Sequence, residues 1–177
     1  GVQMALCNYA TQVRGLQIGL VNYYREDLKG FQLGLVNANP DTKVQMMVYG
    51  GNVTPANIGV RFKNQLFYTI LGAGSMYQGL NDKFSASASY RAGLSFPIYK
   101  GLSISGDLGY QHIETFDNKD KVIPGRLYAL QARANLEYQL TKKFGIFATG
   151  GYGLTRFYNK SGNYDKGAII EAGIVLF

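Results

Sequence analysis

The chain has 177 residues, enough for one domain, and 16% of them are charged, against ~25% in an average soluble domain. It contains no run of ~18 apolar residues, so the sequence excludes a transmembrane helix. The net charge of +7 comes from Lys and Arg that lie at turns and loop flanks and, for Arg91 and Arg133, on the polar faces of strands, rather than in one cluster. We therefore expect contact with anionic lipid headgroups and no nucleic-acid partner.

The first third of the sequence is repetitive. GVQMALCN at 1–8 recurs as GLQIGLVN at 15–22 and as GFQLGLVN at 30–37, with a degenerate copy at 44–50 and a fifth candidate at 56–60. Apolar and polar residues alternate within each unit, which predicts one strand and one turn per unit. The units could be successive antiparallel barrel strands or a short solenoid beside or inside a barrel. The barrel interpretation is favoured because their apolar face has the chemistry of the later strands.

These repeats resemble a bacterial cell-surface family built from tandem units of the kind V-x-G-[LVF]-Q-[IVL]-[AG]-L-V-N. The family occurs in Gram-negative, particularly Bacteroidota-type, proteins. The match covers about residues 1 to 50, and the copy at 30–37 is close to the consensus. The resemblance implies a surface location and a barrel-like segment after the repeats, and it implies no particular activity.

Four long segments in the second half carry an apolar or small residue at every second position, with mostly polar or small residues between: 84–98, 102–111, 127–140 and 144–155. Strands of a soluble sandwich, the alternative, are usually ~5 or 6 residues long, about half of this length. Ten residues at ~3.3 Å each, tilted by ~45°, climb about 23 Å, close to the ~25 Å apolar band of an outer-membrane barrel. The sequence therefore predicts an all-β fold, a transmembrane antiparallel up-and-down β-barrel.

Turn lengths also fit a barrel. Short turns at 63–64, 99–101 and 141–143 alternate with longer connections at 75–83, 116–125 and 159–165, the asymmetry of periplasmic turns and extracellular loops. Counting strands gives eleven, whereas bacterial single-chain barrels have even numbers. We therefore expect about 10–12 strands: ten if 56–72 is one strand, twelve if one lies upstream, with a solenoid role for some repeats as a third solution. Residues 1–177 are treated as one barrel domain, with repeat-derived strands at 1–62 and long amphipathic hairpins at 63–177.

Charged residues on the polar faces of these strands are the candidate functional site. Strand pairing is expected to bring Arg91 close to Asp107, and to set Arg133 and Glu171 on either side of small glycines, with Glu137 further along the same face. Buried charges must be paired or solvated. The two interpretations are a salt-bridge network that fills a small barrel and a charged lining for a narrow aqueous pore.

Two further residues stand out. Phe177 closes the last amphipathic strand and resembles the signal by which the outer-membrane insertion machinery recognises its clients. It shares its parity with Glu171, so a bulge near Gly173 is expected to turn the ring outward and keep the carboxylate inward. His112 is the single histidine and is expected to point outward, beside lipid headgroups.

The sequence thus predicts a non-enzymatic integral protein of the bacterial outer membrane, with no catalytic, cofactor or metal site. The leading hypothesis is a structural or interaction protein, a subunit of a larger outer-membrane assembly. A passive, porin-like narrow pore for small solutes is the alternative, and a lipid-modifying enzyme comes third. The expected partners are outer-membrane lipids and lipopolysaccharide, the insertion machinery and other outer-membrane proteins.

Overall fold

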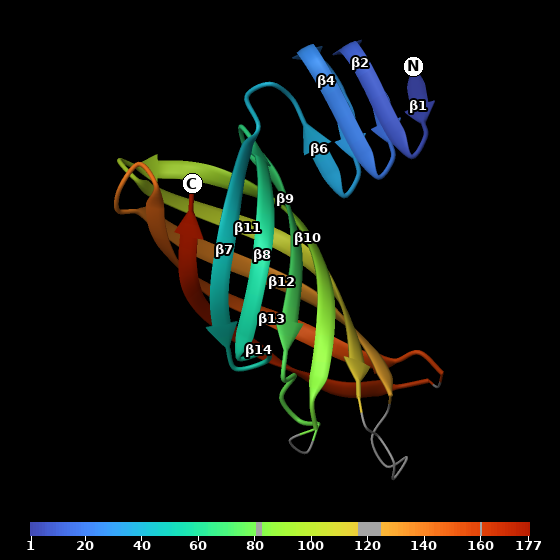
Figure 1. The fold of residues 1–177 in the computed structure, drawn as a ribbon, viewed down its shortest axis with the longest axis vertical. Coiled ribbons are helices and arrows are strands. Elements are labelled where there is room, and N and C mark those ends of the chain that lie inside the picture. The colour runs from blue at the N-terminus through green and yellow to red at the C-terminus, as the bar shows by residue number, and fades with distance from the viewer. Residues whose placement is uncertain (81–82, 117–124, 160) are drawn as a thin grey trace.

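The second part of the chain closes into a barrel (Figure 1). We describe a computed structural model, in which residues 81–82, 117–124 and 160 are left out of the description. Within the described residues, eight antiparallel strands close in the order β10-β11-β12-β13-β14-β7-β8-β9. They are β7 (Lys43–Gly51), β8 (Ala56–Asn64), β9 (Phe67–Ser75), β10 (Ser85–Tyr99), β11 (Leu102–Thr115), β12 (Arg126–Gln139), β13 (Phe144–Phe157) and β14 (Asn163–Leu176). Across the described part of the chain, no helix has the length and apolar character needed to span a membrane.

The predicted all-β antiparallel barrel is confirmed, and the alternation of side chains explains its register. On β12 the odd-numbered residues from Leu127 to Glu137 are buried, whereas most even-numbered ones are exposed. Each of the pairs β11–β12 and β12–β13 continues for thirteen residues without a bulge. A slip by one residue would turn every charged lumen side chain toward the outside, so the register is strongly specified.

The predicted strand number of about 10–12 is wrong, because the described chain has eight barrel strands. The excess came from counting repeat units as barrel strands. The turn expected at 63–64 also lies two residues later, since β8 continues to Asn64 and Gln65 adopts a left-handed conformation with φ of 48°. The expected long connection at 116–125 falls largely outside the described residues.

The first three repeat units form a separate parallel stack, which we call the repeat stack (residues 1–38). One of its sheets has the order β1-β3-β5 and the other β2-β4-β6. The favoured interpretation of these units as barrel strands is therefore wrong, whereas the degenerate copies at 44–50 and 56–60 do lie in β7 and β8. The six strands are β1 (Val2–Met4), β2 (Cys7–Val13), β3 (Leu16–Ile18), β4 (Val21–Leu28), β5 (Phe31–Leu33) and β6 (Val36–Ala38).

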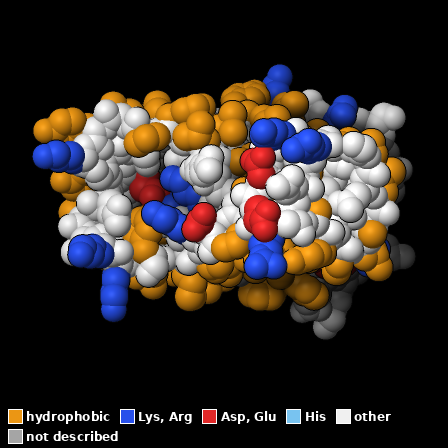
Figure 2. All heavy atoms as spheres, turned by 90° about the horizontal axis from the view of Figure 1, so that it is seen from above, with side chains coloured by type: hydrophobic (Ala, Val, Ile, Leu, Met, Phe, Trp, Pro, Cys, Tyr) orange, Lys and Arg blue, Asp and Glu red, His pale blue; other side chains and the backbone are white. Residues whose placement is uncertain are grey.

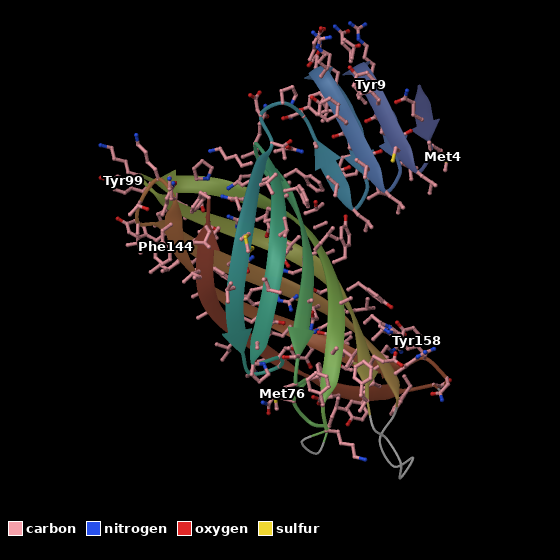
Figure 3. All side chains as sticks on the ribbon, viewed as in Figure 1. Met4, Tyr9, Met76, Tyr99, Phe144 and Tyr158 are labelled. Atoms are coloured by element: carbon pink, nitrogen blue, oxygen red, sulfur yellow. The ribbon has the colours of Figure 1, made fainter. Side chains whose placement is uncertain are left out.

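The repeat stack lies at the end of the barrel that carries the short turns. In Figure 3 this end is marked by Tyr99 and Phe144, and the opposite end, with the longer connections, by Met76 and Tyr158. Residues 39–42 join the stack to β7. Asn64, at the end of β8, anchors this joint because its side-chain amide donates to the Asn37 carbonyl oxygen.

Candidate functional site: the filled lumen of the barrel

Six charged side chains are buried among the described residues, and all six point into the barrel. They comprise three arginines and three carboxylates, so their formal charges cancel: Arg61, Arg91, Arg133, Asp107, Glu137 and Glu171. All five residues singled out from the sequence belong to this lumen charge network. Each comes from the polar face of an alternating strand, where period-two geometry points it away from the apolar outer wall.

Arg91 occupies the centre of the lumen charge network. Its Nε and Nη2 donate to the two carboxylate oxygens of Asp107 at 2.8 and 2.7 Å, a bidentate pair. Its Nη1 lies 3.5 Å from Glu171 Oε2, so the same guanidinium faces a second carboxylate. Asp107 also accepts hydrogen bonds from Tyr68 Oη and Asn135 Nδ2, both at 2.8 Å. Every charge at this centre thus has at least one ionic partner.

Arg133 and Glu171 meet across β13 beside Gly151, an inner-face position without a side chain. Arg133 Nε donates to Glu171 Oε2 at 3.1 Å, and Gly151 pairs with both Arg133 and Ile169 in the sheet. A Cβ at Gly151 would collide with the Ala132 carbonyl oxygen and approach Arg133 Cγ to 3.1 Å. Glycine is therefore required for the arginine to cross the inner wall.

Arg61 was missed in the sequence because its segment was interpreted as the flank of a turn. Its Nη1 donates to Glu137 Oε2 at 2.6 Å, its Nη2 to Glu137 Oε1 at 3.0 Å and its Nε to Gln45 Oε1 at 2.7 Å. The sequence did contain a pattern that predicts its inward position. Arg61 alternates with the apolar Ile58, Val60 and Phe62 and therefore belongs to the opposite, inner face of the strand.

An apolar cluster shares the short-turn half of the lumen with these charged groups. Its buried members are Met47, Tyr49, Tyr68, Ile70, Phe147 and Val175, and Phe177 packs against them. The ring of Phe177 thus lies on the inner side of the sheet, like Glu171. The bulge expected near Gly173 is absent from the described pairing of β13 and β14, which is continuous from Leu176 to Asp165.

A second apolar cluster closes the loop end. Tyr77 and Leu80, from the connection between β9 and β10, pack on Ile113, Leu127 and Ala129 of the inner wall. The Tyr77 hydroxyl lies 2.6 Å from Thr155 Oγ1, and burial raises the pKa of this phenol. Within the described residues, side chains therefore occupy the lumen near the short turns, at its centre and at the loop end, where a cavity of about 290 Å³ remains beside Tyr77 and Gln131.

The outer wall has the opposite composition. Leu94, Leu108, Leu130 and Ile146 are exposed, together with many other large apolar side chains of even-numbered positions. Near the loop end, His112 points outward as expected and its Nδ1 lies 2.7 Å from the Tyr158 hydroxyl. Tyr110 and Tyr128 stack beside it, as in the aromatic girdle of a membrane barrel.

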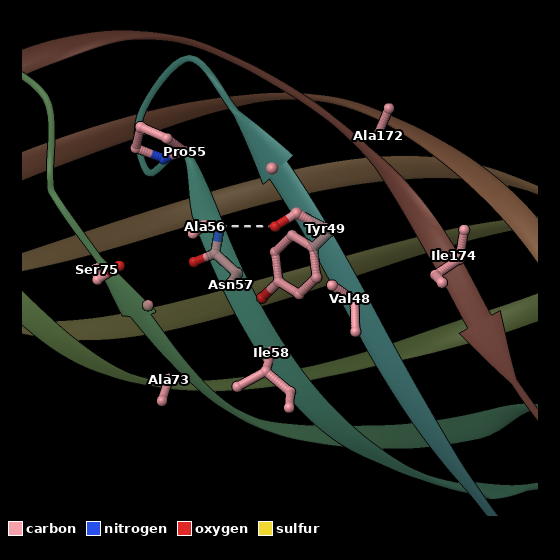
Figure 4. Close-up of a pocket in the computed structure, with 12 residues that line it drawn as sticks. Val48, Tyr49, Pro55, Ala56, Asn57, Ile58, Ala73, Ser75, Ala172 and Ile174 are labelled. Atoms are coloured by element: carbon pink, nitrogen blue, oxygen red, sulfur yellow. Dashed lines mark hydrogen bonds between the residues drawn. The ribbon is translucent and has the colours of Figure 1, made fainter.

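One part of the outer wall is hollowed where small residues replace large ones. A shallow groove of about 730 Å³ runs over β14, β7, β8 and β9 (Figure 4). Alanines at 56, 73 and 172 form its floor between Val48, Ile58 and Ile174. Asn57 Nδ2 donates to the Tyr49 carbonyl oxygen at 3.5 Å beside it. Its lining is apolar, so it belongs to the outer wall rather than to the lumen site.

A closed sheet with a polar, charge-neutral interior and an apolar outside reverses the distribution of a soluble protein. These features define a transmembrane β-barrel of the smallest size: an apolar outer band, aromatic side chains near its loop end and internal pairing of all eight strands. No protein-family model and no curated protein matches the sequence.

A likeness was found with a solved structure, the crystal structure of Neisserial surface protein A (NspA). The TM-score is 0.48 and the sequence identity 9%, and the match covers 75% of this chain and 92% of that chain.

Proposed function

We propose that this chain is a non-enzymatic integral protein of the bacterial outer membrane, whose filled barrel anchors the repeat stack at the membrane and offers it as a contact surface. The observation that carries the proposal is the lumen charge network, in which each of the three arginines forms an ion pair with one of the three carboxylates inside the wall. A pore lining needs charges that face water, whereas these face one another. The geometry therefore favours a plugged scaffold.

The orientation follows from the loop lengths. Short turns face the periplasm and longer loops face outward in barrels of this class. This orientation puts the repeat stack on the periplasmic side, in contrast to the surface position that the family resemblance implies. The loop end, with Tyr110, His112 and Tyr158, is then level with lipopolysaccharide headgroups.

The remaining partners belong to the same proposal. We propose that Phe177 contributes to recognition by the insertion machinery before folding, when its ring is not yet packed in the lumen. Once the barrel is closed, other outer-membrane proteins can reach the repeat stack and the outer wall. A role as a subunit of a larger assembly is consistent with both surfaces.

Conductance in planar lipid bilayers tests the plugged scaffold against the passive pore. We expect no steady channels from the wild-type chain, because side chains fill the lumen at several heights. We expect channels to appear in R91S/R133S, which removes two guanidinium groups from the centre. Steady wild-type channels that R91S/R133S alters in ion selectivity would show that the charges line an open path, and the pore would replace the scaffold.

A further inference from the structure

The repeat stack is built inside out, as the barrel is. The Gln and Asn positions of its units point inward: Gln17 is 1% exposed, Gln32 4%, Asn22 0% and Asn37 2%. The apolar positions point outward, and eight of them are between 39% and 73% exposed: Val2, Met4, Leu6, Leu20, Val21, Phe31, Leu33 and Leu35. Water would favour the reverse arrangement, with the aliphatic side chains inside.

Amide ladders explain how the polar interior is stable. Asn8 donates to Asn22 and Asn22 donates to Asn37, both at 2.8 Å. Gln32 donates to Gln17 at 2.7 Å, and Gln17 in turn donates to Gln3 of the first unit. Buried polar side chains are thus paired along the stack, and the interior needs no water. The unexplained feature is the apolar exterior.

The two ends of the repeat stack differ in polarity. The turns of the units carry Leu6, Leu20 and Leu35, whereas the opposite ends carry charged residues such as Arg14, Arg25 and Glu26. Figure 3 shows Met4 near the turn end and side-chain nitrogen and oxygen atoms gathered at the other end. Seen from that side in Figure 2, charged side chains of both signs gather over the middle of the face, with further Lys and Arg side chains among the hydrophobic ones at its margin.

The apolar end of the stack lies against the outer wall of the barrel, below the rim. The Tyr90 hydroxyl, on the outer face of β10, donates to the Gly34 carbonyl oxygen at 2.8 Å. The Phe31 ring meets the Phe67 ring edge-on at 6.1 Å between centroids. A groove of about 630 Å³ continues from these two rings along the barrel over Leu94, Phe96 and Leu108. The apolar surface of the stack is therefore continuous with the lipid-facing wall.

We infer that the repeat stack lies in the membrane–water interface at the short-turn end, with its turn end and β1-β3-β5 face among lipid acyl chains and its charged end in water. The occupant of the apolar face is lipid, because the face continues the wall that lipid already covers. This inference rests on the proposed membrane location of the barrel and adds a second, monotopic lipid contact to it.

The contact with Tyr90 gives the depth of the turn end. Tyr90 is the sixth of the fifteen residues of β10 and lies nine residues before Tyr99, at the short-turn end of the strand. The turn end of the stack, which carries Gly34, therefore reaches well down the outer wall, where Leu6, Leu20 and Leu35 contact acyl chains, and the charged end stays in water on the short-turn side.

Single tryptophans test the inference directly, since the chain contains none. L20W and R25W place a tryptophan at the apolar turn and at the charged end of the same unit, and L108W reports on the barrel wall. Each full-length variant, shown to be folded by its heat-dependent gel mobility, is reconstituted into phosphatidylcholine vesicles with brominated acyl chains. We expect L20W to lose fluorescence and R25W to keep it.

Each outcome bears on one claim. If bromine quenches the fluorescence of L108W but not that of L20W, the lipid contact is wrong and the apolar face is left to a protein partner. If bromine quenches L20W and R25W equally, the orientation of the stack is wrong. If bromine does not quench the fluorescence of L108W, the membrane location of the barrel itself is wrong. If L20W does not fold, a nitroxide on the single cysteine, the exposed Cys7, replaces it. Collisions of this label with a water-soluble nickel chelate in preference to oxygen would refute the inference.

Discussion

At the scale of single residues, Asp107 has the most demanding position in the molecule. Its carboxylate is buried and accepts hydrogen bonds from the Arg91 guanidinium, from Tyr68 and from Asn135. A charge taken out of water costs several kcal/mol unless paired in this way. Removal of either partner of the pair leaves the other charge buried.

We expect Asp107→Ala to lower the free energy of unfolding by about 3–5 kcal/mol, because Glu171, at 3.5 Å, is then the remaining carboxylate partner of Arg91 among the described residues. Urea-induced unfolding in phospholipid vesicles measures this. The double variant R91M/D107L should recover much of the loss, since apolar side chains of similar volume need no ionic partner. If D107A and R91M/D107L are equally destabilised, packing rather than charge explains the effect.

A matched surface pair provides the control for this measurement. Arg126 Nε lies 3.0 Å from Glu114 Oε2, and the Arg126 side chain is 69% exposed. We expect Arg126→Ala to change the free energy of unfolding by no more than ~1 kcal/mol, because solvent screens exposed pairs. A loss as large as that of D107A would show that burial does not distinguish the two pairs.

At the scale of elements, the barrel and the repeat stack use different hydrogen-bond ladders. Antiparallel hairpins in the barrel pair neighbouring strands of the sequence, whereas each stack strand pairs with its equivalent 14 or 15 residues away. In such a stack each unit contacts only its neighbours, so stability is local.

We expect Asn22→Ala to open the repeat stack while the barrel stays closed. The substitution removes one of the two hydrogen bonds that Asn8 Nδ2 donates and leaves Asn37 Oδ1 without its donor, at ~1–3 kcal/mol for a buried group left unpaired. Hydrogen exchange followed by mass spectrometry should show faster exchange in 1–38 and unchanged exchange in β10–β14.

Thr11→Ala, at an exposed position of β2, is the control for that experiment. It removes a hydroxyl without touching the Asn ladder, so exchange in 1–38 should stay at the wild-type rate. Faster exchange in the barrel strands of N22A would instead show that the two parts unfold together.

At the scale of the whole molecule, the barrel and the repeat stack share one rule, with polar side chains inside and apolar ones outside. They are joined through residues 39–42 and through a few contacts, including Tyr90 with Gly34 and Phe31 with Phe67. All members of the lumen charge network lie in the barrel, downstream of residue 42. The barrel therefore contains the interactions that its own closure requires.

We expect a chain that starts at Asn39 to fold into the closed barrel in detergent micelles and to keep the heat-dependent gel mobility of the full chain. The shortened chain should bind the lipid around the short-turn end less tightly than the full chain does, because it lacks Phe31 and the leucines of the stack turns. Failure of the shortened chain to fold, with the full chain folding under the same conditions, would show that the stack is part of the barrel's core.

Particular residues show which features of the fold and the lumen can be predicted from the sequence alone. The alternation at 127–140 was sufficient to predict a transmembrane strand, its two faces and the inward position of Arg133 and Glu137, because period-two geometry is local. The closeness of Arg91 and Asp107 followed from the turn at 99–101, because a short hairpin fixes its own register. The partner of Glu137 did not follow, since Arg61 lies 76 residues away and meets it only when the barrel closes.

The strand number and the fate of the repeats were decided by tertiary structure. GLQIGLVN at 15–22 alternates like a barrel strand, and an alternating strand can pair with its neighbour in the sequence or with its equivalent in the next repeat. Local chemistry is the same in both cases. In the assembled molecule Asn22 bonds to Asn8 and Asn37, and β7 pairs with β14. Both sets of contacts join distant segments, so only the tertiary structure selects the parallel stack for the repeats.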